Sequence, residues 1–199
     1  MTARSRRLRK LAGYPLTLLA ANLAWMVFSL PVVTWFAAGV ALVHALDRRF
    51  EEDGRGVLSG FWEGWRRTWR RTLPLGLAST VAALILLLNA GFLLGQDSPA
   101  AFLLLAGTVP LALVWLFWHV SLIPVVALFP HLTTRQWLRD SFTLSFQHPG
   151  AMLAVLAAAV LAAGAVLAVP ALLPLCGASL PALLALKLCR HHLPRWSDV

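Results

Sequence analysis

Long apolar stretches alternate along this chain with short polar segments. The apolar stretches cover residues 11–46, 73–95, 100–129, 150–169 and 172–189. A helix that crosses a bilayer needs about 20 predominantly apolar residues, with a range of about 17–25. The first stretch is too long for one ordinary helix, and the pattern therefore predicts two helices within it.

Proline, glycine and small polar residues mark the breaks between these helices. Pro31 disfavours a continuous first helix, and Thr34 can cap a new one. Residues 96–99 form a short polar turn without a cation, and residues 170–174 begin and end with proline. The predicted spans are residues 13–29, 34–47, 74–95, 100–129, 150–169 and 172–189.

The positive charges are confined to the polar segments. All 17 Lys and Arg residues fall in four clusters, at 4–10, 48–71, 135–139 and 187–195. Charge is costly in hydrocarbon, and Lys and Arg collect on the cytoplasmic side of membrane proteins. We therefore expect six spans in three hairpins, in a bacterial cell (inner) membrane, with both termini in the cytoplasm. Five spans is the rival count, which merges one broken pair and loses this segregation of charge.

Composition agrees with a membrane protein. The chain is 59% hydrophobic and 13% charged, whereas soluble domains average about 25% charged residues. We expect an all-α polytopic transmembrane helical bundle that forms a single domain over residues 1–199. The net charge of +9 lies beside apolar spans, so the expected partner is anionic lipid headgroups rather than nucleic acid. The apolar stretch after the N-terminal charges is longer than a signal-peptide core, and we expect this segment to be retained.

One cytoplasmic segment combines aromatic and basic residues. Residues 59–72 are predicted to form an amphipathic helix that lies in the headgroup layer and precedes the third span. The candidate docking residues are Phe61, Trp62, Trp65, Arg66, Trp69 and Arg70. Two interpretations stay open: a belt that fixes topology, or a docking surface for a partner. Gly60 and Gly64 are expected to weaken this helix.

A second cytoplasmic segment, residues 131–149, resembles the first. Trp137, Leu138, Phe142 and Phe146 give it a broad apolar face, with Arg139 and Asp140 outside that face.

Few polar residues interrupt the spans. Asn22 and Asn89 are predicted to form interhelical hydrogen bonds, and His119 to bond a neighbouring helix or lie near the headgroups. The alternative is that these three residues line a transport path. No acidic or basic residue lies near mid-span, and this absence weakens the transporter interpretation. The small-residue pairs Gly91/Gly95 and Ala154/Ala158 permit close packing, either within the fold or in a homo-oligomer.

No enzyme motif is present. The sequence lacks a P-loop, a G-x-S-x-G turn and an H-E-x-x-H helix. We therefore expect no catalytic residue and no cofactor. Cys176 and Cys189 are predicted to lie on opposite faces, and His191 and His192 have no evident third ligand, so we expect no metal site.

The first 75 residues resemble the YesL-like family of bacterial integral membrane proteins of unknown function. The resemblance rests on Asn22-Leu-Ala-Trp25, on Ser29-Leu-Pro-Val-Val-Thr34, and on the basic aromatic segment from Phe61 to Trp69. It implies a multi-span protein of about this length. Members are often associated with carbohydrate uptake systems, which implies an accessory role beside a sugar transporter. The family has no established catalytic or binding residues to carry over.

These observations favour a non-enzymatic accessory or regulatory component of a carbohydrate transport system, in contact with a transport permease. The alternative is a small membrane transporter or channel in its own right.

Overall fold

The computed structural model describes the backbone of residues 3–51 and 56–192, and the side chains of 15–48, 56–174 and 177–191. The described residues form helices and connecting turns without a strand, which confirms the all-α prediction. The α-helices are α1 (Ala3–Ser29), α2 (Trp35–Glu51), α3 (Val57–Leu94), α4 (Pro99–Leu128), α5 (Thr134–Gln147), α6 (Pro149–Ala168), α7 (Leu173–Cys176) and α8 (Ser179–His192). Two short 3₁₀ helices, η1 (Val32–Thr34) and η2 (Pro170–Leu172), lie at two of the predicted breaks. The N-terminal cation cluster, Arg55 and Arg195 lie outside the described side chains.

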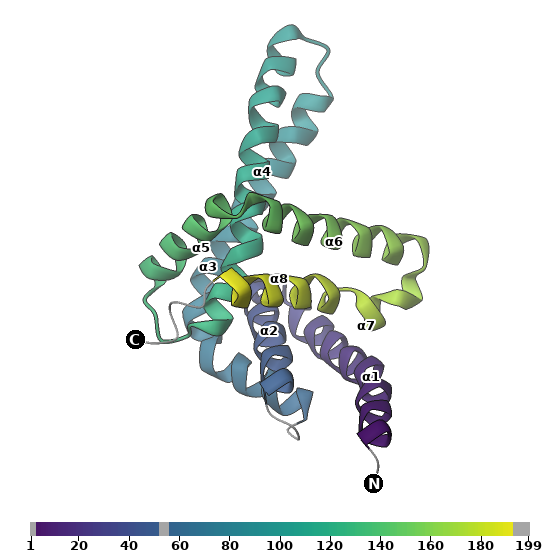
Figure 1. The fold of residues 1–199 in the computed structure, drawn as a ribbon. Helices are drawn as coiled ribbons and strands as arrows, with labels where there is room; N and C mark the ends of the chain where they lie inside the picture. The colour runs from purple at the N-terminus through teal and green to yellow at the C-terminus, as the bar shows by residue number, and fades with distance from the viewer. Residues whose placement is uncertain (1–2, 52–55, 193–199) are drawn as a thin grey trace.

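The helices form a packed base from which one hairpin projects. Figure 1 shows the outer halves of α3 and α4 rising together away from the other helices, with the turn at residues 95–98 at the tip. The helices α6 and α8 run beside each other across the base, and α2 lies behind them. The hairpin tip therefore has no contact partner among the other described helices.

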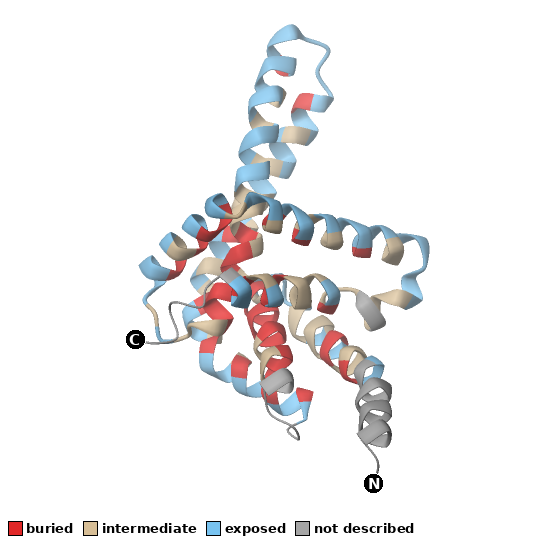
Figure 2. Ribbon diagram, viewed as in Figure 1, coloured by how far each residue is buried: buried red, intermediate tan, exposed pale blue. Residues whose placement is uncertain are grey.

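The centre of the base is α2. Every residue from Phe36 to Val43 is buried, because α1, α3, α4 and α8 all pack against this helix. Figure 2 shows the buried residues gathered on α2 and on the parts of α3 and α4 beside it. The predicted span 34–47 is therefore a helix, but it has 17 residues and is enclosed by other helices rather than by lipid.

The predicted surface helix 59–72 and the predicted span 74–95 form one continuous helix, α3, with Pro74 inside it. An internal proline removes one backbone hydrogen bond and favours a bend. Here the helix continues past Pro74 because α2 and η1 contact it on both sides of the proline. Proline thus marks a bend in α3 and not its first residue.

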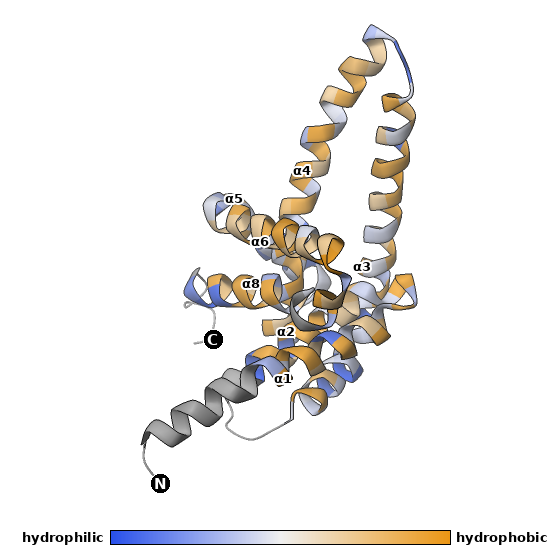
Figure 3. Ribbon diagram, turned by 90° about the vertical axis from the view of Figure 1, so that its right-hand side faces the viewer, coloured by the Kyte–Doolittle hydropathy of each residue, from blue (hydrophilic) through white to orange (hydrophobic). Residues whose placement is uncertain are grey.

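Three of the described helices are long and apolar enough to cross a membrane: α3, α4 and α6. Only 11% of the residues in the most apolar 18-residue stretch of α3 and of α4 are buried within the protein, as expected for helices that face lipid. Figure 3 shows apolar residues along the hairpin and polar residues around the base. Among the other predicted spans, α2 has 17 residues and α8 has 14. The described apolar part of α1 is Pro15–Ser29, and the number of passes stays a prediction.

The first break differs from its prediction in one detail. Thr34 does not cap α2 with its side chain. Its hydroxyl instead donates to the carbonyl oxygens of Phe28 and Pro31, both at 2.7 Å. This hydroxyl therefore satisfies backbone groups at the end of α1 and closes the turn into α2.

Candidate functional site

The first turns of α3 carry a ridge of small residues that packs on α2. The ridge consists of five buried residues spaced four apart: Gly60, Gly64, Thr68, Thr72 and Gly76. Residues four apart lie on one face of a helix. We refer to these five residues as the small-residue seam. The hydroxyls of Thr68 and Thr72 bond the backbone carbonyls of Gly64 and Thr68, at 2.8 and 3.0 Å, so the seam presents no unsatisfied donor to α2.

The glycines of the seam allow the two helices to approach closely. A Cβ added at Gly60 would lie 3.4 Å from Ala45 Cα, and one at Gly64 only 2.9 Å from His44 Cδ2. Sequence reasoning treated Gly60 and Gly64 only as weak points of the helix. The signal for their packing role was the four-residue spacing of small residues, which is typical of close helix contacts in membranes.

Two of the predicted docking residues belong to the structural core. Phe61 is 2% exposed, and its ring centroid lies 5.3 Å from that of Phe28 in α1. Trp65 is half-buried and lies edge-on to the same ring at 4.8 Å. Phe28 therefore covers Phe61 and part of Trp65, and its ring centroid also lies 6.0 Å from that of the exposed Trp62.

The other four predicted docking residues form a stripe on α3 that is exposed except at the half-buried Trp69. They are Trp62, Arg66, Trp69 and Arg70. Trp62 is 54% exposed, Arg66 and Arg70 are exposed, and the Arg70 guanidinium lies 5.3 Å from the Trp69 ring centre. We call these four residues the Trp–Arg stripe. It offers indole surface and two cations on one face of α3, a combination suited to anionic and aromatic groups.

The next arginine, Arg71, has a structural role. The Arg71 guanidinium donates to the carbonyl oxygens of Pro130 and Leu132, at 2.8 and 2.7 Å. It also lies 4.6 Å from the ring centre of Trp137. Arg71 therefore links α3 to the turn between α4 and α5.

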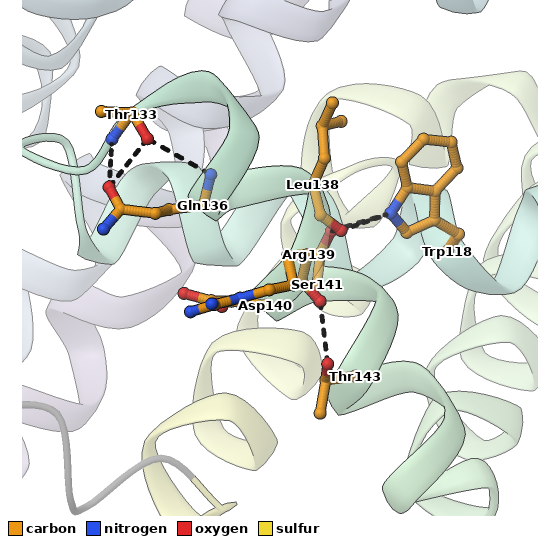
Figure 4. A network of polar contacts seen from close by, with 8 residues as sticks. All are labelled: Trp118, Thr133, Gln136, Leu138, Arg139, Asp140, Ser141 and Thr143. Atoms are coloured by element: carbon orange, nitrogen blue, oxygen red, sulfur yellow. Dashed lines mark hydrogen bonds and ion pairs between the residues drawn. The ribbon is translucent and has the colours of Figure 1, made fainter.

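Hydrogen bonds between α4 and α5 determine which face of α5 is buried. Trp118 donates to Ser141 Oγ at 2.8 Å (Figure 4), and the hydroxyls of Ser121 and Ser145 lie 2.6 Å apart. Ser141 and Ser145 are buried with Trp137, whereas Phe142 and Phe146 are exposed. Of the predicted broad apolar face, Trp137 therefore packs within the protein, whereas Phe142 and Phe146 stay exposed.

Serines suit this interface because they are small and their hydroxyls bond helix carbonyl oxygens. Ser145 Oγ, for example, donates to the carbonyl oxygen of Ser141 at 2.9 Å. Thr133 and Gln136 form a capping box at the start of α5 (Figure 4).

The polar residue Asn22 joins α1 to the start of α8. It is fully buried, its amide nitrogen donates to Ser179 Oγ at 2.9 Å, and its oxygen accepts from the backbone nitrogens of Ala178 and Ser179 at 3.2 and 2.9 Å. The first N–H groups of a helix have no partner within the helix. Asn22 supplies that partner from a distant part of the sequence, and it is an interhelical hydrogen-bonding residue as predicted.

The other two predicted intramembrane residues have separate surroundings. Asn89 donates to Thr108 Oγ1 at 2.9 Å and thereby joins α3 to α4 within the hairpin. His119 is buried between the indole rings of Trp115 and Trp35, at 4.5 and 5.6 Å, and among the described residues it has no hydrogen-bond partner. Each of the three predicted residues thus contacts different helices.

No group of three or more His, Cys, Asp or Glu side chains that could hold a metal ion occurs among the described residues. Cys189 is buried and free, and the side chains of Cys176 and His192 lie outside the described residues.

Comparison with known proteins finds a family match for a segment within the first half of the chain. Residues 18–90 match a family model described as "Protein of unknown function, DUF624". No curated protein matches the chain, and no solved structure matches it. The matched segment contains α2, the small-residue seam and the Trp–Arg stripe. The helices that carry these features are therefore similar to those of a family whose function is unknown.

Proposed function

We propose that this chain is a non-enzymatic integral membrane protein that acts as an accessory or regulatory subunit of a transport system. In this proposal the Trp–Arg stripe contacts the transport permease. The observation that carries the proposal is the exposure of Trp62, Arg66 and Arg70 on a helix that packs closely against α2. Interface hot spots are enriched in Trp and Arg, and a rigid helix presents them at little cost in conformational entropy.

The carbohydrate specificity of that system is inferred from the resemblance to YesL-like proteins. The match of residues 18–90 to a family of unknown function is compatible with this inference. We further propose that the protein lies in a bacterial inner membrane with six passes and cytoplasmic termini. The positive-inside rule supports this topology, because the cations cluster in alternate connecting segments.

Transport by the chain itself has less support. The amides of Asn22 and Asn89 already form helix–helix hydrogen bonds, and His119 is enclosed by aromatic rings. The three residues make their contacts on different helices and share no contact with one another. A path for a polar substrate would need several polar groups that converge.

The proposal is tested by purifying the tagged protein from its native host in mild detergent, followed by quantitative mass spectrometry. We expect a transport permease or its solute-binding protein in stoichiometric amount. Recovery of the chain alone, as a monomer or homo-oligomer, would contradict the proposal and direct work to flux assays in liposomes.

Two matched variants test the docking surface itself. Arg66 and Arg135 are both exposed arginines on helices, but only Arg66 belongs to the stripe. We expect Arg66→Glu to reduce recovery of the permease several-fold, because a carboxylate replaces the cation. Arg135→Glu makes the same charge change elsewhere and should leave recovery unchanged. Equal recovery with both variants would show that the stripe is not the contact.

A further inference from the structure

An apolar groove of about 580 Å³ lies between α6 and the helices of the base. Its volume falls within the range of about 300–1,000 Å³ that is typical of ligand sites. One wall is the inward face of α6, which includes Ala159, Ala162 and Val166. The opposite wall combines residues of α1, α2, α4 and α8, among them Trp25 and Val43.

The lining excludes water and polar ligands. Among the lining residues, only Trp25 and Trp35 carry a polar side-chain atom. The indole nitrogen of Trp35 already donates to Thr80 Oγ1 at 2.9 Å. A buried water needs two to four polar partners, and an apolar cavity that offers fewer does not hold one. The occupant must therefore be apolar along the length that enters the groove.

The groove is continuous with the lipid-facing surface of the protein. The helix α6 is long and apolar enough to cross a membrane, and its outward residues Val160 and Leu161 are 63% and 73% exposed. Ala163 and Leu167 both line the groove and are exposed. A lipid chain beside α6 can therefore reach the groove without crossing a polar region.

The walls of the groove suit a flexible occupant. Small residues line both walls, with Ala159 and Ala163 on one side and Gly39 and Ala182 on the other. Contacts of α6 with α4, α5, η2 and α8 hold this helix in place. An acyl chain is narrow and can follow the groove between packed helices, whereas a helix of a second copy has a diameter of about 10–12 Å.

We propose that the groove binds one acyl chain of a bilayer phospholipid. The bound chain fills the space under α6 and supplies packing contacts that the small lining residues do not make. This inference is independent of the docking role proposed for the Trp–Arg stripe.

The test uses the full-length protein in vesicles of phosphatidylethanolamine and phosphatidylglycerol. A trace of the phosphatidylglycerol carries a photoreactive diazirine in the middle of one acyl chain. After irradiation, mass spectrometry locates the adducts. We expect adducts on Trp25, Ala159 and Ala182, which line the groove and are partly exposed, at several-fold the yield found on the outward residue Leu161. Equal yields at groove and outward positions would overturn the proposal, because they indicate contact with bulk lipid only.

Two variants of α6 provide the control. Ala159→Phe places a ring in the groove and should reduce the adducts on Trp25 and Ala182 several-fold. Ala157→Phe makes the same change at an exposed position that does not line the groove, and should leave them unchanged. Adducts that persist in Ala159→Phe would overturn the proposal, as would a dimer whose formation leaves the wild-type groove unlabelled. If Ala159→Phe does not fold, the wild-type adduct map still decides the question.

Discussion

Single glycines of the seam set the distance between α2 and α3. Gly76 is buried, and a Cβ at this position would lie 3.0 Å from the carbonyl oxygen of Val33 and 3.1 Å from Phe36 Cβ. The carbonyl oxygen belongs to the backbone and cannot rotate away. Gly91 lies further along the same helix, and a Cβ there would meet nothing within 4 Å. The same residue type thus has different roles at two positions of one helix.

We predict that Gly76→Ala destabilises the protein, because the added methyl group forces α2 and α3 apart at a cost of about 1–3 kcal/mol. Gly91→Ala should be neutral or stabilising by up to about 1 kcal/mol, since alanine is the better helix former. Thermal unfolding in mild detergent, with both variants in the same buffer, measures the difference. Equal melting temperatures for Gly76→Ala and the wild type would show that the seam is not closely packed.

At the scale of elements, α5 packs on the protein with a face that its aromatic residues did not indicate. The buried face carries Ser141 and Ser145 beside Trp137, and Phe142 and Phe146 are exposed. Arg71 in α3 fixes the turn before α5, because its guanidinium donates to two backbone carbonyl oxygens of that turn. Arg71 was counted with the other cations of its cluster, because spacing on one helix does not reveal acceptors contributed by a distant turn.

We predict that Arg71→Ala lowers the melting temperature and speeds proteolysis between residues 129 and 133, since two carbonyl oxygens lose a charged donor. Hydrogen bonds to charged groups contribute about 1.5–3 kcal/mol, with the lower end expected for this exposed side chain. Arg66→Ala removes an exposed cation from the same helix and serves as the control. Limited proteolysis with mass mapping would contradict the prediction if both variants were cut at the same rate.

At the scale of the whole molecule, the lengths and surroundings of the helices bear on how many of them cross the membrane. The helices α3, α4 and α6 are long enough, but α2 is buried among its neighbours and has only 17 residues. A short helix can still complete a crossing inside a bundle, because its neighbours, rather than lipid, surround it. The position of η1 therefore decides whether α1 and α2 form a hairpin across the membrane.

We predict that η1 and the turn at Asp97 both face the outside. Single cysteines at Val32, Asp97 and Thr133, in a chain whose own cysteines are replaced by serine, can be labelled with a membrane-impermeant maleimide on intact spheroplasts. Val32→Cys and Asp97→Cys should react at once, and Thr133→Cys only after permeabilisation. Reaction of Val32→Cys only after permeabilisation would exclude the six-span topology.

Much of this protein could be derived from its sequence alone. The apolar stretches, the prolines and the confinement of charge determine that it is helical, that it is a membrane protein, and where most helices end. These properties depend on residue type and on neighbours along the chain. The hydrogen-bonding role of Asn22 was also predictable, since an amide in an apolar helix needs a partner.

Only the tertiary structure decided which faces meet. It placed Phe61, Trp62 and Trp65 around Phe28, yet it buried Phe61 and left Trp62 exposed, although all three aromatic residues share one pattern. It also showed that Gly60 and Gly64, which the sequence marks only as weak helix formers, pack closely against α2. The physical reason is that burial depends on which residues from distant parts of the chain arrive at a face, and helical periodicity describes a single segment.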